Sequence, residues 1–184
     1  MKTESQQKFQ SKMLADCRDI LEANGITAIL TNSALLGAYR DGDLIPHCYG
    51  AVFTCFRSEV KPRELTLLKD LGRAGFKVVK HFINDNYKIR IIKPFDGKTF
   101  TIEIVAYSDN GQVYYRQLKK KKKIIPKKLL RPPYSKIKLR GETYTAPKNI
   151  PKFLRFLYVN WKIKRGPGGS PSAYKNGKHM VVKK

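Results

Sequence analysis

The hydrophobic positions at the start of the chain recur at helical spacing. Residues 4–24 carry apolar side chains three or four positions apart: Phe9, Met13, Leu14, Cys17, Ile20 and Leu21. Thr3 followed by Gln6 fits a capping box at the beginning of this segment, and Gly25 is a suitable stop at its end. The pattern therefore predicts one amphipathic helix that buries a single face.

The following segments alternate between strand and helix patterns. Residues 26–30 predict a short buried strand, and Ser33 is a candidate cap for a helix over residues 34–40. The alternating residues 48–56 predict a second strand, and Pro62 is well placed to open the next helix.

The second half of the chain is dominated by strand patterns. Residues 76–83 and 87–94 flank the hairpin signal NDN, and residues 98–107 predict a strand that ends at the tight turn DNGQ. Residues 136–147 predict a small hairpin with Gly141 in its turn. A last helix should begin at Pro151 and include Trp161 on or near its apolar face. This order of elements indicates an α/β or α+β domain built around a mixed sheet.

Two basic segments lack these periodic patterns. The lysine run at residues 119–123 predicts an exposed, solvated loop. Residues 166–184 are rich in Gly, Pro, Ser and Lys and predict a flexible basic tail. The remaining residues 1–165 are enough for a single domain with one hydrophobic core.

Charge is the most unusual compositional feature. The 184 residues include 38 Lys and Arg against 14 Asp and Glu, a formal net charge of +24. The three cysteines (Cys17, Cys48 and Cys55) form neither a C-x-x-C pair nor an even disulfide set. The N-terminus is polar and no apolar run is long enough to span a membrane. We therefore expect a cytoplasmic protein with reduced thiols and an affinity for polyanions.

Four ordered segments resemble the LicD family, which includes the fukutin-related proteins. They are ILTNSALLGAYRDGDLIPHCYGAVF, LKDLGRAGFKV, TIEIVAY and GETYTAPKNIPKFLRFLYVNWKIKRGP, and the resemblance covers about residues 10–167. The resemblance implies a nucleotidyltransferase fold, with a mixed sheet flanked by helices. It also implies transfer of a phosphorylated small molecule, such as phosphocholine or a polyol phosphate, from a nucleotide-activated donor to a glycan acceptor, with Mg²⁺ or Mn²⁺. The nucleotide or phosphate contacts that it implies are Asn32, Ser33, Gly37, Arg40 and His47.

The metal-binding positions of the family are where this sequence departs from the pattern. Alternate residues after Ile-Pro-His are aspartates in the family, and here the matching positions hold Cys48, Gly50 and Val52. Period-two spacing places such residues on one face of a strand, where aspartates could hold a divalent cation together. Glu103, in the later strand, is the remaining acidic candidate. One carboxylate and a soft thiol are a poor match for Mg²⁺, so no cofactor is expected for this sequence.

Each of these residues also has a purely structural interpretation. Ser33 can cap a helix instead of holding a phosphate. Arg40 can pair with a neighbouring aspartate, Asp41 or Asp43, and His47 can be a half-buried packing residue. Glu103 can face a lysine across the sheet.

Two other chemistries involving Cys48 receive little support. A zinc site made of His47, Cys48 and Cys55 lacks a fourth ligand. Activation of a Cys48 nucleophile by His47 is disfavoured, because adjacent residues in a strand point to opposite faces.

Two classes of function remain, with a third suggested by charge alone. The first is a LicD-like protein that keeps the fold but is catalytically inactive. The second is an active transferase with a non-standard site. The third is a basic protein that binds nucleic acid or other polyanions; its aromatic residues fit core spacing better than a stacking platform.

The net charge generates a prediction of its own. We expect weak, sequence-independent binding to nucleic acid, because lysine-rich surfaces attract phosphates without reading bases. Raising salt from 50 to 200 mM should weaken binding by about tenfold or more, since bound counterions are released with each phosphate contact. Fluorescence anisotropy with labelled oligonucleotides of different sequence measures this, and salt-insensitive or sequence-selective binding would contradict it.

Overall fold

The computed structural model describes residues 1–83, 86–118, 121–158, 160–164 and 182–183. Within these residues the helices are α1 (Glu4–Ala23), α2 (Asn32–Arg40), α3 (Arg57–Val60), the 3₁₀ turn η1 (Lys61–Arg63), α4 (Glu64–Arg73), α5 (Lys127–Leu130) and α6 (Ile150–Leu157). The strands are β1 (Ile29–Thr31), β2 (Gly50–Phe56), β3 (Lys77–Ile83), β4 (Asn86–Phe95), β5 (Lys98–Asp109), β6 (Val113–Leu118), β7 (Lys121–Pro126), β8 (Ser135–Leu139), β9 (Glu142–Ala146) and β10 (Val182–Lys183).

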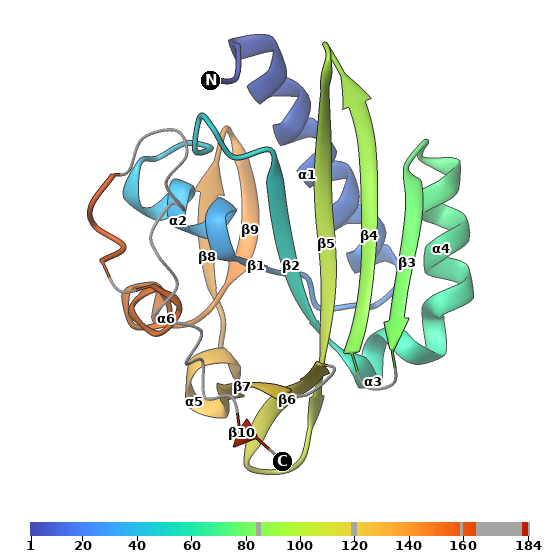
Figure 1. The fold of residues 1–184 in the computed structure, drawn as a ribbon, viewed down its shortest axis with the longest axis vertical. Helices are drawn as coiled ribbons and strands as arrows, with labels where there is room; N and C mark the ends of the chain where they lie inside the picture. Colours follow the sequence, from blue (N-terminus) through green and yellow to red (C-terminus); the bar gives the residue numbers. More distant parts are fainter. Residues whose placement is uncertain (84–85, 119–120, 159, 165–181, 184) are drawn as a thin grey trace.

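The strands form one mixed sheet that is organised around β5. One part of the sheet has the order β8-β9-β1-β2-β5-β4-β3, and β5 continues past β4 to pair with β6, which leads on to β7 and β10. The pairs β2–β5 and β1–β9 are parallel, and the remaining pairs are antiparallel. Figure 1 shows this sheet with helices around it and with the β6–β7 hairpin at the end of β5. The predicted α/β fold with a mixed sheet flanked by helices is confirmed.

The first helix begins and ends as the sequence predicts. The Thr3 hydroxyl accepts from Gln6 N, and the Gln6 side chain accepts from Thr3 N, which completes the capping box. Gly25 follows the helix with a φ of +66°, a conformation that glycine adopts readily. The buried face of α1 includes Leu14 and Cys17, which reach the sheet core.

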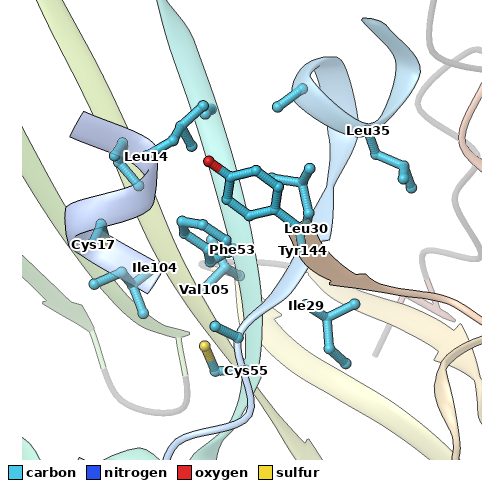
Figure 2. Close-up of a cluster of buried hydrophobic side chains, with 14 of the residues drawn as sticks. Leu14, Cys17, Ile29, Leu30, Leu35, Phe53, Cys55, Ile104, Val105 and Tyr144 are labelled. Atoms are coloured by element: carbon cyan, nitrogen blue, oxygen red, sulfur yellow. The ribbon is translucent and has the colours of Figure 1, made fainter. Parts of the chain in front are cut away.

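The two faces of β2 and β5 have different surroundings. Odd-numbered residues of β2 and even-numbered residues of β5 enter the main core, where Phe53 and Ile104 are fully buried beside Leu14 and Cys17 of α1. Figure 2 shows these side chains packed between the helix and the strands, with Tyr144 of β9 adjacent. The alternate residues therefore point to the opposite face, which carries the hollows described below.

Three sequence-based expectations are wrong. Ser33 is not the cap of α2: the cap position is Thr31, and the Ser33 hydroxyl donates to the Gly50 carbonyl oxygen at 3.1 Å. The helix starts at Asn32, earlier than predicted, and Asn32 itself has a left-handed φ of 56°. The helical segment expected to open at Pro62 begins at Arg57, as the short turns α3 and η1 that lead into α4.

The third wrong expectation concerns the lysine run. Residues 121–123 are not a loop but the beginning of β7, which pairs with β6. Residues 119 and 120 lie outside the described residues, as do residues 84–85 of the NDN turn.

The C-terminal expectations have mixed outcomes. The final helix, α6, begins at Ile150 under an Asn149 cap and ends at Leu157, so Trp161 lies beyond it. Most of the predicted tail, residues 166–181 and 184, lies outside the described residues, and β10 pairs with β7. No helix within the described residues is both long enough and apolar enough to cross a membrane.

The contact between α2 and the following loop generates a stability prediction. A Cβ at Gly37 would collide with the Asp43 carbonyl oxygen and lie 3.1 Å from Ile45 N, so Gly37→Ala must push this loop away. We expect a loss of about 1–3 kcal/mol in the free energy of unfolding, typical of overpacking. Urea denaturation measures it. The matched control is Gly72→Ala in α4, where no atom lies within 4 Å, and it should be neutral or stabilising. Equal effects of both substitutions would contradict the prediction.

Candidate functional site

The parallel register of β2 and β5 builds the floor of the candidate site. Gly50 lies beside Thr101, and Val52 lies beside Glu103. Neighbouring residues in register point to the same face of a sheet, so all four belong to one surface. A hollow of about 230 Å³ opens there, lined by Asn32, Ser33, Cys48, Gly50, Ala51, Val52, Thr101 and Glu103.

Two further hollows continue along the same strand faces. A small cavity of about 60 Å³ shares Asn32, Val52 and Glu103 with the first hollow and adds Arg116 and Lys123. A larger hollow of about 670 Å³ shares Tyr107 with the small cavity and lies at the C-terminal ends of β2 and β5. We call these three hollows together the trough; it runs from Cys48 at one end to the region around Tyr107 at the other.

Glu103 is the carboxylate at the centre of the trough. Lys88 Nζ donates to its Oε1 at 2.7 Å, and Arg90 donates to the same oxygen from NH2 at 3.0 Å and from Nε at 3.3 Å. Burial alone would raise the pKa of Glu103, but the hydrogen bonds and charges of Lys88 and Arg90 outweigh it and lower the pKa. Glu103 is therefore ionised and already compensated by two cations.

The segment that carries Cys48 is held from outside the trough. Lys2 Nζ donates to the Cys48 carbonyl oxygen at 3.0 Å and to the Gln10 side-chain oxygen, and Gln10 Nε2 also donates to the Cys48 carbonyl at 3.3 Å. The Lys2 backbone N–H donates to the Pro46 carbonyl oxygen at 2.8 Å. The Cys48 thiol itself donates to the Gly50 carbonyl oxygen at 3.3 Å. These bonds position the approach to β2 from the side of α1.

A second group of contacts fixes the loop after α2. Arg140, in the β8–β9 turn, pairs with Asp43 at 2.7 Å and with Glu4 at 2.8 Å. The loop is thereby tied to both α1 and β9, and none of these three residues lines the trough.

The residues implied as phosphate contacts are divided between the trough and its surroundings. Asn32 and Ser33, at the beginning of α2, line the first hollow. Gly37 faces the Asp43 backbone and does not line it. His47 is half-buried, its Nε2 atom has no hydrogen-bond partner, and it does not line the hollow either.

Arg40 is occupied by structural partners. Its Nε and NH2 donate to the two Asp41 carboxylate oxygens at 3.0 and 2.7 Å, and its NH1 donates to the carbonyl oxygens of Trp161 and Ile163. The side chain is 8% exposed. Arg40 thus connects the end of α2 to the segment after α6.

The cysteine and histidine candidates do not converge. Cys55 lies in the core on the opposite face of β2 from the trough, whereas Cys48 lines the first hollow. Among the described residues, no three His, Cys, Asp or Glu side chains gather closely enough to hold a metal ion. The donors present in the trough, one cation-paired carboxylate and one thiol, do not fit Mg²⁺ or Mn²⁺, which prefer several oxygen ligands.

Sequence reasoning did not identify four cations that belong to this site: Lys88, Arg90, Arg116 and Lys123. The alternation in YKIRIIKP could have placed Lys88 and Arg90 on one strand face, but only the register with β5 sets them against Glu103. Lys123 was hidden within a run of identical residues.

The comparisons with known proteins agree with this architecture. A family model described as LicD/FKTN/FKRP, nucleotidyltransferase domain, matches residues 25–149, well over half of the chain. The chain belongs to the LicD family. A search of curated proteins gives no match. Membership in the LicD family indicates a phosphotransferase-like function and, in general, a nucleotide-activated donor and a glycan acceptor.

The buried ammonium of Lys2 generates a pH prediction. Burial lowers the pKa of Lys2 to about 8 in the folded protein, against an ordinary value of 10.5. Between these values the unfolded chain binds the extra proton, so stability gains with rising pH. Relative to Lys2→Met, the wild type should gain about 1–3 kcal/mol of unfolding free energy between pH 7.5 and 10. Urea denaturation of both proteins across this range measures the difference, and a pH-independent difference would refute the prediction.

Proposed function

We propose that this LicD-family protein keeps the ligand trough of the fold but does not catalyse metal-dependent phosphoryl transfer. The observation that carries the proposal is the state of Glu103. Its register neighbour on β2 is Val52, and its own charge is compensated by Lys88 and Arg90. A divalent cation at this place would meet one occupied carboxylate and two positive side chains.

The electrostatics explain why such a site would be inactive. In phosphoryl transfer the cation neutralises the phosphate oxygens and orients the reacting groups. Removing even one preorganised donor commonly costs about 10²- to 10³-fold in rate. Here Cys48, Gly50 and Val52 stand at the positions that the family resemblance assigns to aspartates, so the whole first shell would be missing.

The ligand class follows from the family and is part of the proposal. We expect the trough to accept a phosphorylated small molecule of the kind that LicD-like enzymes transfer, phosphocholine or a polyol phosphate, or its nucleotide-activated form. An active enzyme with a non-standard site is the competing function. It would need a separate acidic cluster, and the described residues do not provide one.

Restoring the acids tests the proposal. The variant is Cys48→Asp, Gly50→Asp, Val52→Asp; position 50 has room, since a Cβ there would lie 3.9 Å from the nearest atom, the Thr101 carbonyl oxygen. We expect this variant to bind Mg²⁺ or Mn²⁺ at least about tenfold more tightly than the wild type, because three carboxylates outweigh Lys88 and Arg90. Calorimetry measures binding, and a panel of CDP-activated donors measures turnover.

The matched control carries Asn at the same three positions, which adds similar volume without charge. It should behave like the wild type in metal binding. If the wild type binds metal as tightly as the Asp variant and turns over a donor, the proposal is wrong. If the Asp variant also fails to bind metal, the assignment of these three positions to a metal site is wrong.

A further inference from the structure

Two cations face each other across the β6–β7 hairpin beside the trough. Arg116 of β6 and Lys123 of β7 are register partners, so their side chains leave the same face of the hairpin. Both line the small cavity of about 60 Å³, together with Glu103 and Tyr107. The β6–β7 hairpin therefore places two positively charged side chains at the small cavity in the middle of the trough.

The two side chains are half-buried, and the Arg116 guanidinium lies over the Tyr107 ring, 5.8 Å from its centre. Arg116 Nε is buried and has no hydrogen-bond partner. Burial, followed by the nearby charge of Arg116, lowers the pKa of Lys123 to about 8, with only a partial opposite effect from Glu103. Like charges directly opposite each other in a sheet are destabilising, and a buried donor without a partner adds a further cost.

The local charges do not balance. Lys88, Arg90, Arg116 and Lys123 surround one carboxylate, Glu103. Glu103 accepts three hydrogen bonds from Lys88 and Arg90, all at Oε1. Among the residues that line the small cavity, Glu103 is the one acidic side chain, so an excess of positive charge remains. Folding alone gives no reason for this arrangement, whereas an anionic ligand does.

We propose that Arg116 and Lys123, supported by Lys88 and Arg90, bind a phosphoryl group in the small cavity without a divalent cation. A tetrahedral oxyanion suits the donors, because a guanidinium can offer two parallel N–H groups and an ammonium adds a point charge. The cavity has room for a group of a few heavy atoms. The lysine and arginine charges would then serve the neutralising role that a metal serves elsewhere.

This inference rests on the proposed function in one respect, that the ligand lies in the same trough. It adds the identity of the groups that recognise the phosphoryl end and the independence from metal. The phosphoryl group can belong to free phosphate or to an ester. An ester would extend from the cavity along the trough, toward the larger hollow that begins at Tyr107.

Calorimetric titration in excess EDTA tests the inference, with inorganic phosphate and a nucleoside monophosphate as probes. We expect the wild type to bind both. Lys123→Met should weaken binding by about tenfold or more, the loss of one charge-assisted hydrogen bond. The matched control is Lys122→Met, which removes the same charge from the neighbouring residue of β7, whose ammonium lies over the Tyr115 ring at 5.1 Å. It should change affinity by less than about twofold, since adjacent strand residues face opposite sides.

Folding is checked independently of binding. Lys123→Met should have a higher melting temperature than the wild type, because it removes a buried like charge. Arg116→Gln serves as a second variant and should also weaken phosphate binding. If the nucleoside monophosphate binds more tightly than inorganic phosphate, the rest of the ligand also contacts the trough. If the two bind with equal affinity, recognition is restricted to the phosphoryl group. Both outcomes support the inference.

Three results would overturn it: no binding by the wild type in EDTA, binding that appears only with Mg²⁺, or equal weakening by Lys123→Met and Lys122→Met. These outcomes are separate from those of the aspartate restoration. Phosphate binding in EDTA can fail while the wild type still lacks metal binding and turnover, and in that case the proposed absence of metal-dependent catalysis stands without the inference.

Discussion

The parallel pairing of β2 with β5 is the constraint on which the rest of the molecule depends. Its register places Phe53 beside Ile104 on one face and Val52 beside Glu103 on the other. The first pair lies in the main core under α1, and the second forms the floor of the trough. A shift of one residue in either strand would exchange core and trough side chains, so packing of the core fixes the chemistry of the opposite face.

The trough face is positively charged because the strands on both sides of it contribute lysine and arginine side chains. β4 contributes Lys88 and Arg90 by antiparallel pairing with β5, and the β6–β7 hairpin contributes Arg116 and Lys123 from the other end. Glu103 is the point where these contributions meet. Bringing cations together in a partly buried space is costly unless an anion joins them. The trough is thus better suited to an anion than to a metal ion.

Local patterns were enough to predict much of the fold. The Thr3–Gln6 capping box, the stop at Gly25 and the turn at Gly141 (φ 86°) depend on neighbouring residues alone, and the structure contains all three. Ser33 precedes an apolar run, which makes it a candidate cap. Its hydroxyl instead satisfies the Gly50 carbonyl, a partner 17 residues away that no local pattern identifies.

The site was less predictable than the fold, for the same reason. Alternation in β2 correctly grouped residues 50 and 52, and the family resemblance pointed to Glu103, so the acidic side of the site was accessible from sequence. The cationic side was not. Lys123 belongs to a run of five lysines, and only the register of the β6–β7 hairpin places it opposite Arg116 at the small cavity. A run of lysines therefore does not show which of its side chains faces a cavity, because the cost of burial is set by tertiary partners.

The contacts that hold the loops beside the trough do not depend on the side chains that line it. Lys2 and Gln10 hold the Cys48 carbonyl, and Arg140 holds Asp43; these bonds use backbone atoms or residues that lie outside the trough. The side chains at positions 48, 50 and 52 contribute little to these contacts, so replacing clustered carboxylates there removes mutual repulsion and leaves the scaffold intact. In this fold, the atoms that fasten the loops beside the trough are therefore different from the side chains that line it.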